Sequence, residues 1–403
     1  MRKLIALTLL APAVALANGY SVPNVNPRDL AMADSTVAAQ GDAAATNMNP
    51  AALSKLEGLQ LSLGFSYLDI SNEWADPATG GEASTRYKPV PPVALFAGYG
   101  GKLGERGWGV GFGLGVPAGG AVLWDEDWEG RFRIVEVDRK VYATYLTGGI
   151  ELFPGVRVGG GAIYYRTTEH LVQKLDFLTS EGTAELATAG GKLSYELAIE
   201  LTCPRLPLTL GIDYKHQAVQ ELEGEAHFED IPASFQGTLA DQPATHTLTI
   251  PNFLNVGLAY RPIKPLLLTL GWTLDRYEVY VEDRFAGTAG TMPDVVVPRN
   301  YGNGQTWRLG AEWDQSDRLT LRAGVLRDLS GLKTDTYSPT LPDGDSWAFA
   351  AGAAWKFTPK LSVSGALFYA LFDTVKVTGT EAFQGEFEPS ALIASVGVVW
   401  RPL

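Results

Sequence analysis

The chain has 403 residues, of which 46% are hydrophobic and 19% charged, and its formal net charge is -13. This apolar content excludes a disordered chain, and the acidic excess opposes nucleic-acid binding, which needs a basic surface. No run of about 20 apolar residues occurs, which excludes a polytopic helical membrane protein. The single cysteine, Cys203, excludes an intramolecular disulfide and a cysteine-only metal site.

Residues 1–17 have the pattern of a secretory signal peptide. The first three residues are basic in character, residues 4–16 are apolar, and Ala15-Leu16-Ala17 has the small-x-small pattern of a cleavage site. The apolar stretch is too short to span a bilayer. We therefore expect cleavage after Ala17 and a mature chain that leaves the cytoplasm.

Residues 18–57 are predicted to form short helices. Asn26-Pro27 and Asn49-Pro50 each place a capping side chain before a proline that suits the first helical position. Gly58 is expected to end the second of these helices. Helices this short are not stable alone, so they must pack inside a larger structure.

From Leu59 onward, apolar residues alternate with polar or small residues, which predicts strands with one apolar face. The alternation recurs in about fourteen segments, near residues 59–70, 91–100, 106–116, 139–152, 155–168, 190–202, 206–220, 246–261, 265–282, 304–314, 318–329, 346–357, 360–377 and 390–401. Short turns alternate with long polar loops, which we expect at 71–90, 117–138, 169–189, 221–245, 283–303, 330–345 and 378–389. Loops sorted by length to two sides are typical of outer-membrane barrels. The sequence therefore predicts an all-β fold, a 14-stranded antiparallel transmembrane β-barrel over residues 58–403.

Aromatic residues mostly fall near strand ends on the apolar face, which predicts two girdles at the water interfaces. Ordinary core aromatics are the alternative. The residues concerned are Tyr67, Tyr99, Trp108, Tyr164, Tyr214, Tyr260, Trp272, Trp313, Trp347, Trp355, Tyr369 and Trp400.

Several blocks resemble the FadL/TodX-type long-chain fatty acid transporters of the Gram-negative outer membrane. Residues 26–38 and 41–53 look like the plug signature of that family, whose core here is Asn49-Pro50-Ala51. Two later pairs of blocks also fit, residues 116–117 with 128–132 and residues 321–324 with 341–347. The family has fourteen strands around an N-terminal hatch. The chain departs from outer-membrane barrels at its end, Trp400-Arg-Pro-Leu403, where an aromatic residue is usual.

The resemblance implies passive uptake of long-chain fatty acids or similar hydrophobic molecules, in contact with outer-membrane lipid and lipopolysaccharide. It also implies plug rearrangement and lateral release through a gap at a kinked third strand. The expected plug or gating residues are Asn47, Asn49, Pro50 and Ala51. A monomer is expected, with no cofactor and no metal.

The third strand supports such a gap with its lumen-facing row of glycines and the proline after it. Glycine weakens a strand and proline cannot donate to the ladder. A second interpretation stays open, in which a bulky plug presses on this wall and only glycine leaves room. The residues concerned are Gly109, Gly111, Gly113, Gly115 and Pro117.

Two groups of residues are candidates for ligand contact. A substrate carboxylate needs a basic partner, for which Arg131, Arg157, Arg308 and Arg322 are candidates, although ion pairs within the lumen would also explain them. A first-contact surface is expected where apolar side chains interrupt a polar loop, unless they fold back onto the barrel rim. These are Leu171, Leu175, Phe177 and Leu178.

Two other functions fit the sequence less well. A porin or structural barrel disagrees with a filled plug. A lipid-modifying barrel enzyme would need a serine or cysteine held by a histidine and a carboxylate, and no pattern singles one out. The four histidines lack metal-ligand spacing, so we expect no enzyme.

Overall fold

The computed structural model describes residues 21–86, 92–289, 292, 294–334, 337–340, 343–378 and 383–402. The predicted signal peptide, residues 1–17, lies outside the described residues. Among the residues that are described, no helix is long and apolar enough to cross a membrane.

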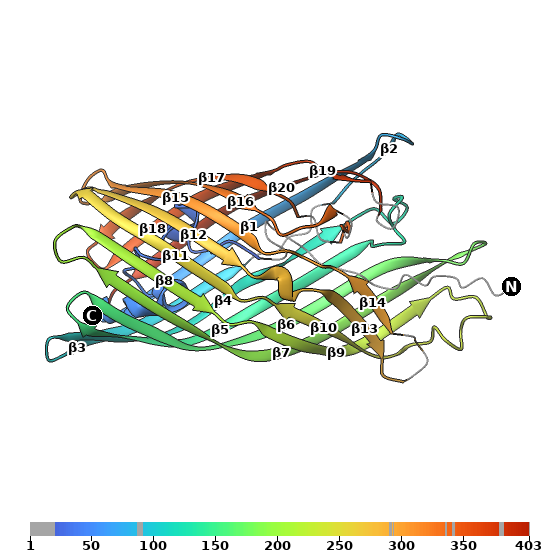
Figure 1. Cartoon of the computed structure of the whole chain (residues 1–403), viewed down its shortest axis with the longest axis horizontal. Coiled ribbons are helices and arrows are strands. Elements are labelled where there is room, and N and C mark those ends of the chain that lie inside the picture. The colour runs from blue at the N-terminus through green and yellow to red at the C-terminus, as the bar shows by residue number, and fades with distance from the viewer. Residues whose placement is uncertain are drawn as a thin grey trace.

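The strands form one antiparallel sheet that closes on itself (Figure 1). Closure occurs at β1, which pairs with β3 on one side and with β20 on the other. The strands are β1 (Gly58–Asp76), β2 (Gly81–Ser84), β3 (Val93–Leu103), β4 (Arg106–Leu123), β5 (Glu136–Phe153), β6 (Val156–Asp176), β7 (Glu181–Thr202), β8 (Leu208–Lys215), β9 (Ala218–Glu229), β10 (Gln242–Ile250), β11 (Phe253–Ile263), β12 (Leu266–Asp275), β13 (Glu282–Gly287), β14 (Val295–Pro298), β15 (Gly304–Asp314), β16 (Leu319–Leu329), β17 (Ser346–Thr358), β18 (Leu361–Phe372), β19 (Val375–Val377) and β20 (Gly385–Trp400).

Within the described ranges, these segments make fourteen barrel strands, as the sequence predicts. Six of the fourteen consist of two consecutive segments: β2 with β3, β8 with β9, β10 with β11, β12 with β13, β14 with β15, and β18 with β19. The partners show why: β7, for example, pairs with β8 along one stretch and with β9 along the next. The predicted all-β barrel is therefore confirmed.

Several predicted loops are instead extensions of the strands. Residues 169–189 belong mostly to β6 and β7, which stay paired from Val156 with Leu201 up to Asp176 with Glu181. Side chains there still alternate between buried and exposed, but the exposed face is polar. The sequence of this segment therefore resembles that of a polar loop, although its backbone continues the paired strands of the barrel.

One predicted strand is interrupted instead of continuous. The segment at 265–282 breaks after β12, where the 3-10 helix η2 (Tyr277–Val279) intervenes before β13. Tyr277 and Tyr280 are both fully buried there. The chain leaves the wall at this point to place two large side chains in the interior.

Exposed aromatic side chains lie toward both ends of the apolar outer surface. Trp313 and Trp355 lie next to the short turns, whereas Trp307 and Trp347 lie toward the opposite end of the same strands. Trp307 and Trp347 share one row, because each is paired with Arg327 of the strand between them. This arrangement agrees with two girdles at the membrane–water interfaces.

The plug lies inside the barrel near the end that carries the short turns (dark blue in Figure 1). It contains α1 (Pro27–Ala31), α2 (Ala45–Met48) and the 3-10 helix η1 (Pro50–Lys55). The Asn26 side chain accepts a hydrogen bond from the Arg28 amide, and the Asn49 side chain accepts one from the Ala51 amide. Both predicted capping residues therefore begin their helices.

The barrel wall carries glycine where the plug backbone approaches it. A Cβ atom on Gly109 would lie 2.2 Å from the Leu53 carbonyl oxygen, and one on Gly149 would lie 2.2 Å from the Pro50 carbonyl oxygen. Similar collisions with plug atoms would occur at Gly107, Gly111, Gly159, Gly211, Gly257, Gly310, Gly324 and Gly352. No real Cβ fits at such distances, so these glycines let plug and wall touch.

We expect Gly109→Ala to push η1 away from β4, because the added methyl group meets backbone atoms that have no flexible end. Overpacking of this kind costs about 1–3 kcal/mol, and a displaced plug leaves a wetter lumen. Single-channel conductance in planar bilayers should rise, and the plug should become sensitive to protease. Gly101→Ala in the neighbouring strand β3 is the control, because its Cβ would lie 3.8 Å from the nearest atom, Nε1 of Trp108. Equal conductance in both variants would contradict this account.

Candidate functional site

A cavity lies in the lumen beside the plug. It holds about 1410 Å³ of space free of protein atoms, and part of this space is continuous with the surrounding solvent. Plug residues including Val22, Asn47 and Met48 contribute to its lining. Much of its wall is apolar, and those side chains are Ala94, Phe96, Tyr145, Tyr165, Ile250, Phe253, Leu326, Ala348, Phe368, Ala370 and Phe372.

The wall formed by β12, β15 and β16 is polar instead. Arg308 donates a hydrogen bond to the Thr273 hydroxyl, while its Nε atom is buried without a hydrogen-bond partner. Asp275 lies near one end of this wall, and Asp328 accepts a hydrogen bond of 2.7 Å from Thr306. Of the four arginines that the sequence analysis names as candidates for ligand contact, Arg308 is the one that lines the cavity.

Asp34 adds a carboxyl group to this polar wall from the plug. Its Oδ2 atom accepts a hydrogen bond of 2.8 Å from the Asn24 amide. Burial raises the pKa of Asp34 to about 7, although the positive charge of Arg308 opposes the rise.

The third barrel strand, β4, is irregular where it borders the cavity. Gly115 is paired with Ala143 and Ala118 with Val141, so β4 holds one more residue than β5 between these pairs. Such a β-bulge bends its strand. Pro117, predicted to mark a kink, lies within this bulge.

The other edge of β4 loses its regular partner at the same place. The ladder to β3 ends at Leu114, which is paired with Leu95. Beyond it, the Val22 amide donates to the Pro117 carbonyl at 2.9 Å, and Ser21 forms an isolated bridge with Ala118. The start of the described chain therefore lies along the edge that β3 has left, and both Val22 and Pro117 line the cavity.

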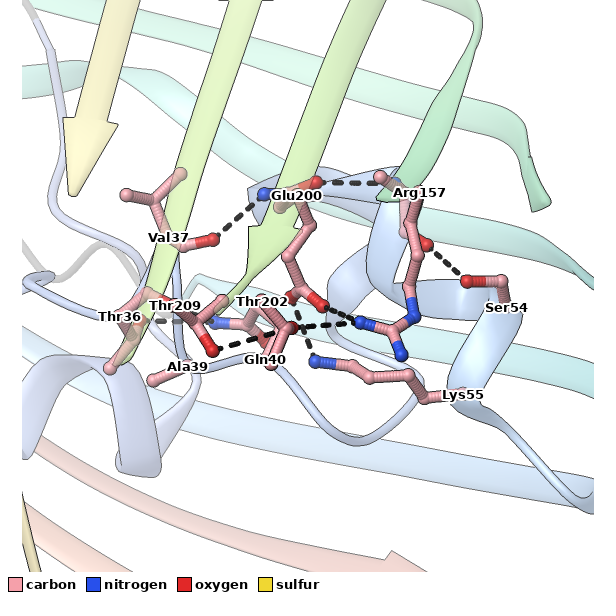
Figure 2. A network of polar contacts seen from close by, with 12 residues as sticks. Thr36, Val37, Ala39, Gln40, Ser54, Lys55, Arg157, Glu200, Thr202 and Thr209 are labelled. Atoms are coloured by element: carbon pink, nitrogen blue, oxygen red, sulfur yellow. Dashed lines mark hydrogen bonds and ion pairs between the residues drawn. The ribbon is translucent and has the colours of Figure 1, made fainter. Parts of the chain in front are cut away.

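Arg157 does not line the cavity but belongs to an ion-pair network that holds the plug (Figure 2). Its NH1 atom lies 3.0 Å from Glu200, and its NH2 atom lies 2.9 Å from Glu151. Lys55, at the end of η1, lies 2.8 Å from the same Glu200 carboxylate. Figure 2 shows the plug and wall cations converging on Glu200, which is fully buried.

Arg322 takes part in a second network of the same kind. Glu312 lies 3.0 Å from Arg28 of α1 and 2.8 Å from Arg322 of β16. One wall carboxylate thus again joins a plug cation to a wall cation. Arg157 and Arg322 are therefore placed as the alternative interpretation expects, in lumen ion pairs.

The remaining candidate residues lie toward the long-loop end. Arg131 pairs with Glu181 at 2.7 Å, and this ion pair raises the pKa of Arg131. Leu171, Leu175 and Phe177 are buried in a cluster with Trp74, Trp124 and Trp128. The expected exposed patch thus reduces to Leu178, which is 83% exposed. The other three fold inward because they continue the lumen-facing row of β6.

The predicted plug residues occupy three different environments. Asn47 faces the cavity and accepts a hydrogen bond from Asn24 at 3.4 Å. Asn49 lies outside the cavity lining, within the plug, and its side-chain amide donates to the Val37 carbonyl at 2.9 Å. Pro50 and Ala51 rest against the wall glycines Gly149 and Gly159.

A sequence model of the family described as "Outer membrane protein transport protein (OMPP1/FadL/TodX)" matches residues 8–401. The chain belongs to this family. It is therefore an outer-membrane transport protein and not an enzyme, as the sequence predicts. Among curated proteins, the 47 kDa outer membrane protein of Pasteurella multocida is 25% identical over 88% of this chain and 89% of that protein.

Solved structures share the fold over nearly the whole chain. A Pseudomonas aeruginosa FadL homologue has a TM-score of 0.84 at 19% identity, covering 95% of this chain and 99% of its own. The toluene transporter TodX of P. putida has a TM-score of 0.74 at 17% identity, covering 92% and 98%. At these identities the likeness concerns the fold.

Sequence reasoning missed the acidic and aromatic lining of the cavity. Asp328 and Asp275 stand on the lumen-facing rows of predicted strands, so their direction was readable from the alternation. Asp34, in the plug, gave no such signal. Its position depends on how the plug folds, which no periodicity reports.

We expect Glu200→Gln to loosen the plug, because Lys55 and Arg157 would then share an uncharged partner. Removing one member of a buried pair costs roughly 3–5 kcal/mol, and the partial exposure of Lys55 places this case at the low end. Protease cleavage in residues 36–56 and channel conductance should both increase. Glu151→Gln is the control, because Glu151 contacts Arg157 without contacting the plug. An effect as large in Glu151→Gln would refute an anchoring role for Glu200.

Proposed function

We propose that the protein is a passive, energy-independent channel for long-chain fatty acids or similar hydrophobic molecules. The observation that carries this proposal is the largely apolar cavity, bounded by the plug and bordered by the bulged strand β4. A polar porin has no need of an apolar cavity or of a plug packed into a glycine-lined wall. Relatives in fold support hydrophobic cargo, since one is named a toluene transporter and another a monoaromatic hydrocarbon channel.

The route begins at the long-loop end, where aromatic side chains form a buried cluster. The Trp124 and Trp128 rings stack at 4.1 Å, and Trp74 meets Trp128 edge-on at 6.0 Å. These rings have almost no surface exposed to water, so entry requires the cluster to part. Apolar surface that then leaves water stabilises the entering molecule by about 25 cal/mol per Å², and the molecule passes to the cavity. The flow needs no energy source because the molecule moves down its own gradient.

The exit is sideways, at the edge of β4 between Gly115 and Ala118. A hydrophobic molecule released there reaches lipid directly and does not cross water. Ser21 and Val22 cover this edge through few backbone contacts, so the opening requires their displacement, together with a rearrangement of the plug around Asn47. Of the predicted gap residues, Gly115 and Pro117 border the cavity, whereas Gly109, Gly111 and Gly113 give room to the plug or to Phe96.

The exit is tested by locking the covering segment. Ser21 and Ala118 are bridge partners, and antiparallel partners have Cα atoms about 4.5–5.5 Å apart, within reach of a disulfide. We expect cells that express the double variant Ser21→Cys, Ala118→Cys to lose uptake of labelled oleate when oxidised and to regain it after reduction. Uptake by cells that lack the gene gives the baseline.

The control cross-link joins β16 to β17, far from the gap, by Ala323→Cys with Ala351→Cys, which are also paired. Oxidation of this variant should leave uptake unchanged. Full uptake through the locked Ser21–Ala118 barrel would place the exit elsewhere. If wild-type cells take up neither oleate nor toluene above the baseline, the proposed function itself is wrong.

A further inference from the structure

The upper part of the lumen contains two apolar regions with charged residues between them. On β5, the successive inward-facing residues are Val137, Arg139 and Val141. Val137 belongs to the aromatic cluster at the long-loop end, and Val141 belongs to a second cluster that includes cavity-lining residues. The same order of an apolar, a charged and again an apolar or aromatic residue recurs in Leu171, Glu169 and Tyr165 on β6, in Ala244, His246 and Leu248 on β10, and in Phe285, Asp283 and Tyr280 around the start of β13.

The charged residues form one connected chain, the charged belt, which consists of Arg139, Glu169, His246, Asp283 and Arg299. Arg139 donates to Glu169 at 2.6 Å, and Arg299 donates to Asp283 at 2.8 Å. His246 lies between these two ion pairs, with Nδ1 2.8 Å from Glu169 and Nε2 3.1 Å from Asp283. All five residues are at most 4% exposed. The belt is therefore a buried polar layer between two apolar regions.

The belt crosses the interior of the barrel instead of following its wall. β6 and β10 are not adjacent, because β7 and β9 lie between them, so the contact between the belt residues of β6 and β10 spans the lumen. At the other end of the belt, Arg299 donates to Thr340 at 3.4 Å. Tyr337, in the same segment as Thr340, packs against Phe387 of β20 at 4.6 Å. Contacts at this level thus run from β5 across the lumen to β20.

His246 is the residue that joins the two halves of the belt. Glu169 and Asp283 each have an arginine of their own, so each half is an ion pair without the histidine. Carboxylate oxygens accept hydrogen bonds, so the ring makes both contacts at once when both of its nitrogens carry a proton. The contacts of His246 can therefore break while both carboxylates stay paired.

We propose that the charged belt is a second gate, separate from the plug, which closes the lumen between the long-loop end and the cavity with His246 as its clasp. This inference rests on the proposed function, because it concerns the route of the hydrophobic molecule. Such a molecule cannot replace the hydrogen bonds of the belt, so it passes when the two halves part at His246. The halves rejoin afterwards, because a buried imidazolium without a carboxylate partner is unfavourable.

The gate is tested by the rate at which an apolar reagent reaches the cavity from outside the cell. The reporter is a thiol introduced by Ala370→Cys, since Ala370 lines the cavity, in a Cys203→Ser background that leaves no other thiol. Intact cells are treated with N-cyclohexylmaleimide, and mass spectrometry of the purified protein gives the labelling rate. Entry by other routes, including the edge of β4, contributes equally to every variant compared.

His246→Leu should be labelled about ten-fold faster, because losing a hydrogen bond to a charged group lowers a barrier by roughly that factor. His246→Gln keeps a side-chain donor and should fall between His246→Leu and the wild type. His170→Leu is the matched control, because His170 also lies between two carboxylates, 3.1 Å from Glu136 and 2.6 Å from Glu185, but on the outer face of β6. Its labelling rate should stay within about two-fold of the wild type, as expected for an exposed ion pair.

Heat-modifiable migration on gels verifies that each variant is a folded barrel, and His246→Gln alone decides if His246→Leu does not fold. Labelling of the folded His246 variants at the wild-type rate or slower would overturn the inference, because the belt would then only brace the barrel. Equal acceleration in His170→Leu would also overturn it, since crossing the lumen would not matter. Either result leaves the proposed function intact if wild-type cells take up oleate or toluene, whereas failure of the proposed function appears as absent uptake in the wild type.

Discussion

The structure depends on a steric constraint: a folded plug must fit inside a barrel whose wall is already closed. Side chains on the inner face would occupy the space that the plug needs. The wall meets this constraint with glycine at the points of contact, so that backbone lies against backbone, as at Gly109 with Leu53 and Gly149 with Pro50. Dense packing of this kind excludes water from that part of the lumen.

Backbone contacts alone cannot fix the position of the plug, because they offer little to interlock. The ion pairs supply position. Glu312 of β15 and Glu200 of β7 each join a cation of the plug to a cation of the wall. Buried charges are stable only when they are paired. Moving the plug would separate its cations from both carboxylates, which costs free energy. The glycines make room, and the carboxylates hold the plug in place.

The sequence predicted most of the fold because a barrel wall is a repeated local pattern. Alternation along each strand reports which side chains face lipid, and it located all fourteen strands. The alternation of apolar and polar residues ends at the membrane boundary, because the outer faces of β6 and β7 become polar beyond this boundary while the strands continue. It also could not foresee the break at Tyr277, where tertiary packing of two tyrosines outweighs the pattern.

The candidate site was less predictable, because it is assembled from distant segments. The direction of Arg308, Arg157 and Arg322 into the lumen was readable. Arg157 and Arg322 each meet an acid that is the directly paired residue on a neighbouring strand, Glu200 and Glu312 respectively. That a plug cation joins each of these acids depends on how the plug folds. Lys55 of the plug reaches Glu200, which is 145 residues away in the sequence. Arg28 of the plug reaches Glu312, which is 284 residues away. Pairing over such separations leaves no periodic trace in one sequence.

The third strand links the plug to the edge of the cavity. Its first half, with Gly107 and Gly109, lies against η1, and its second half contains the bulge at Pro117. The segment at Val22 that covers the bulge belongs to the same chain as the plug and meets it again through Asn24, which contacts both Asp34 and Asn47. A shift of the plug around Asp34 or Asn47 therefore pulls on the cover as well. Asp34 also lines the cavity and interacts electrostatically with Arg308, so the plug, the covering segment and the polar wall of the cavity meet at this one carboxyl group.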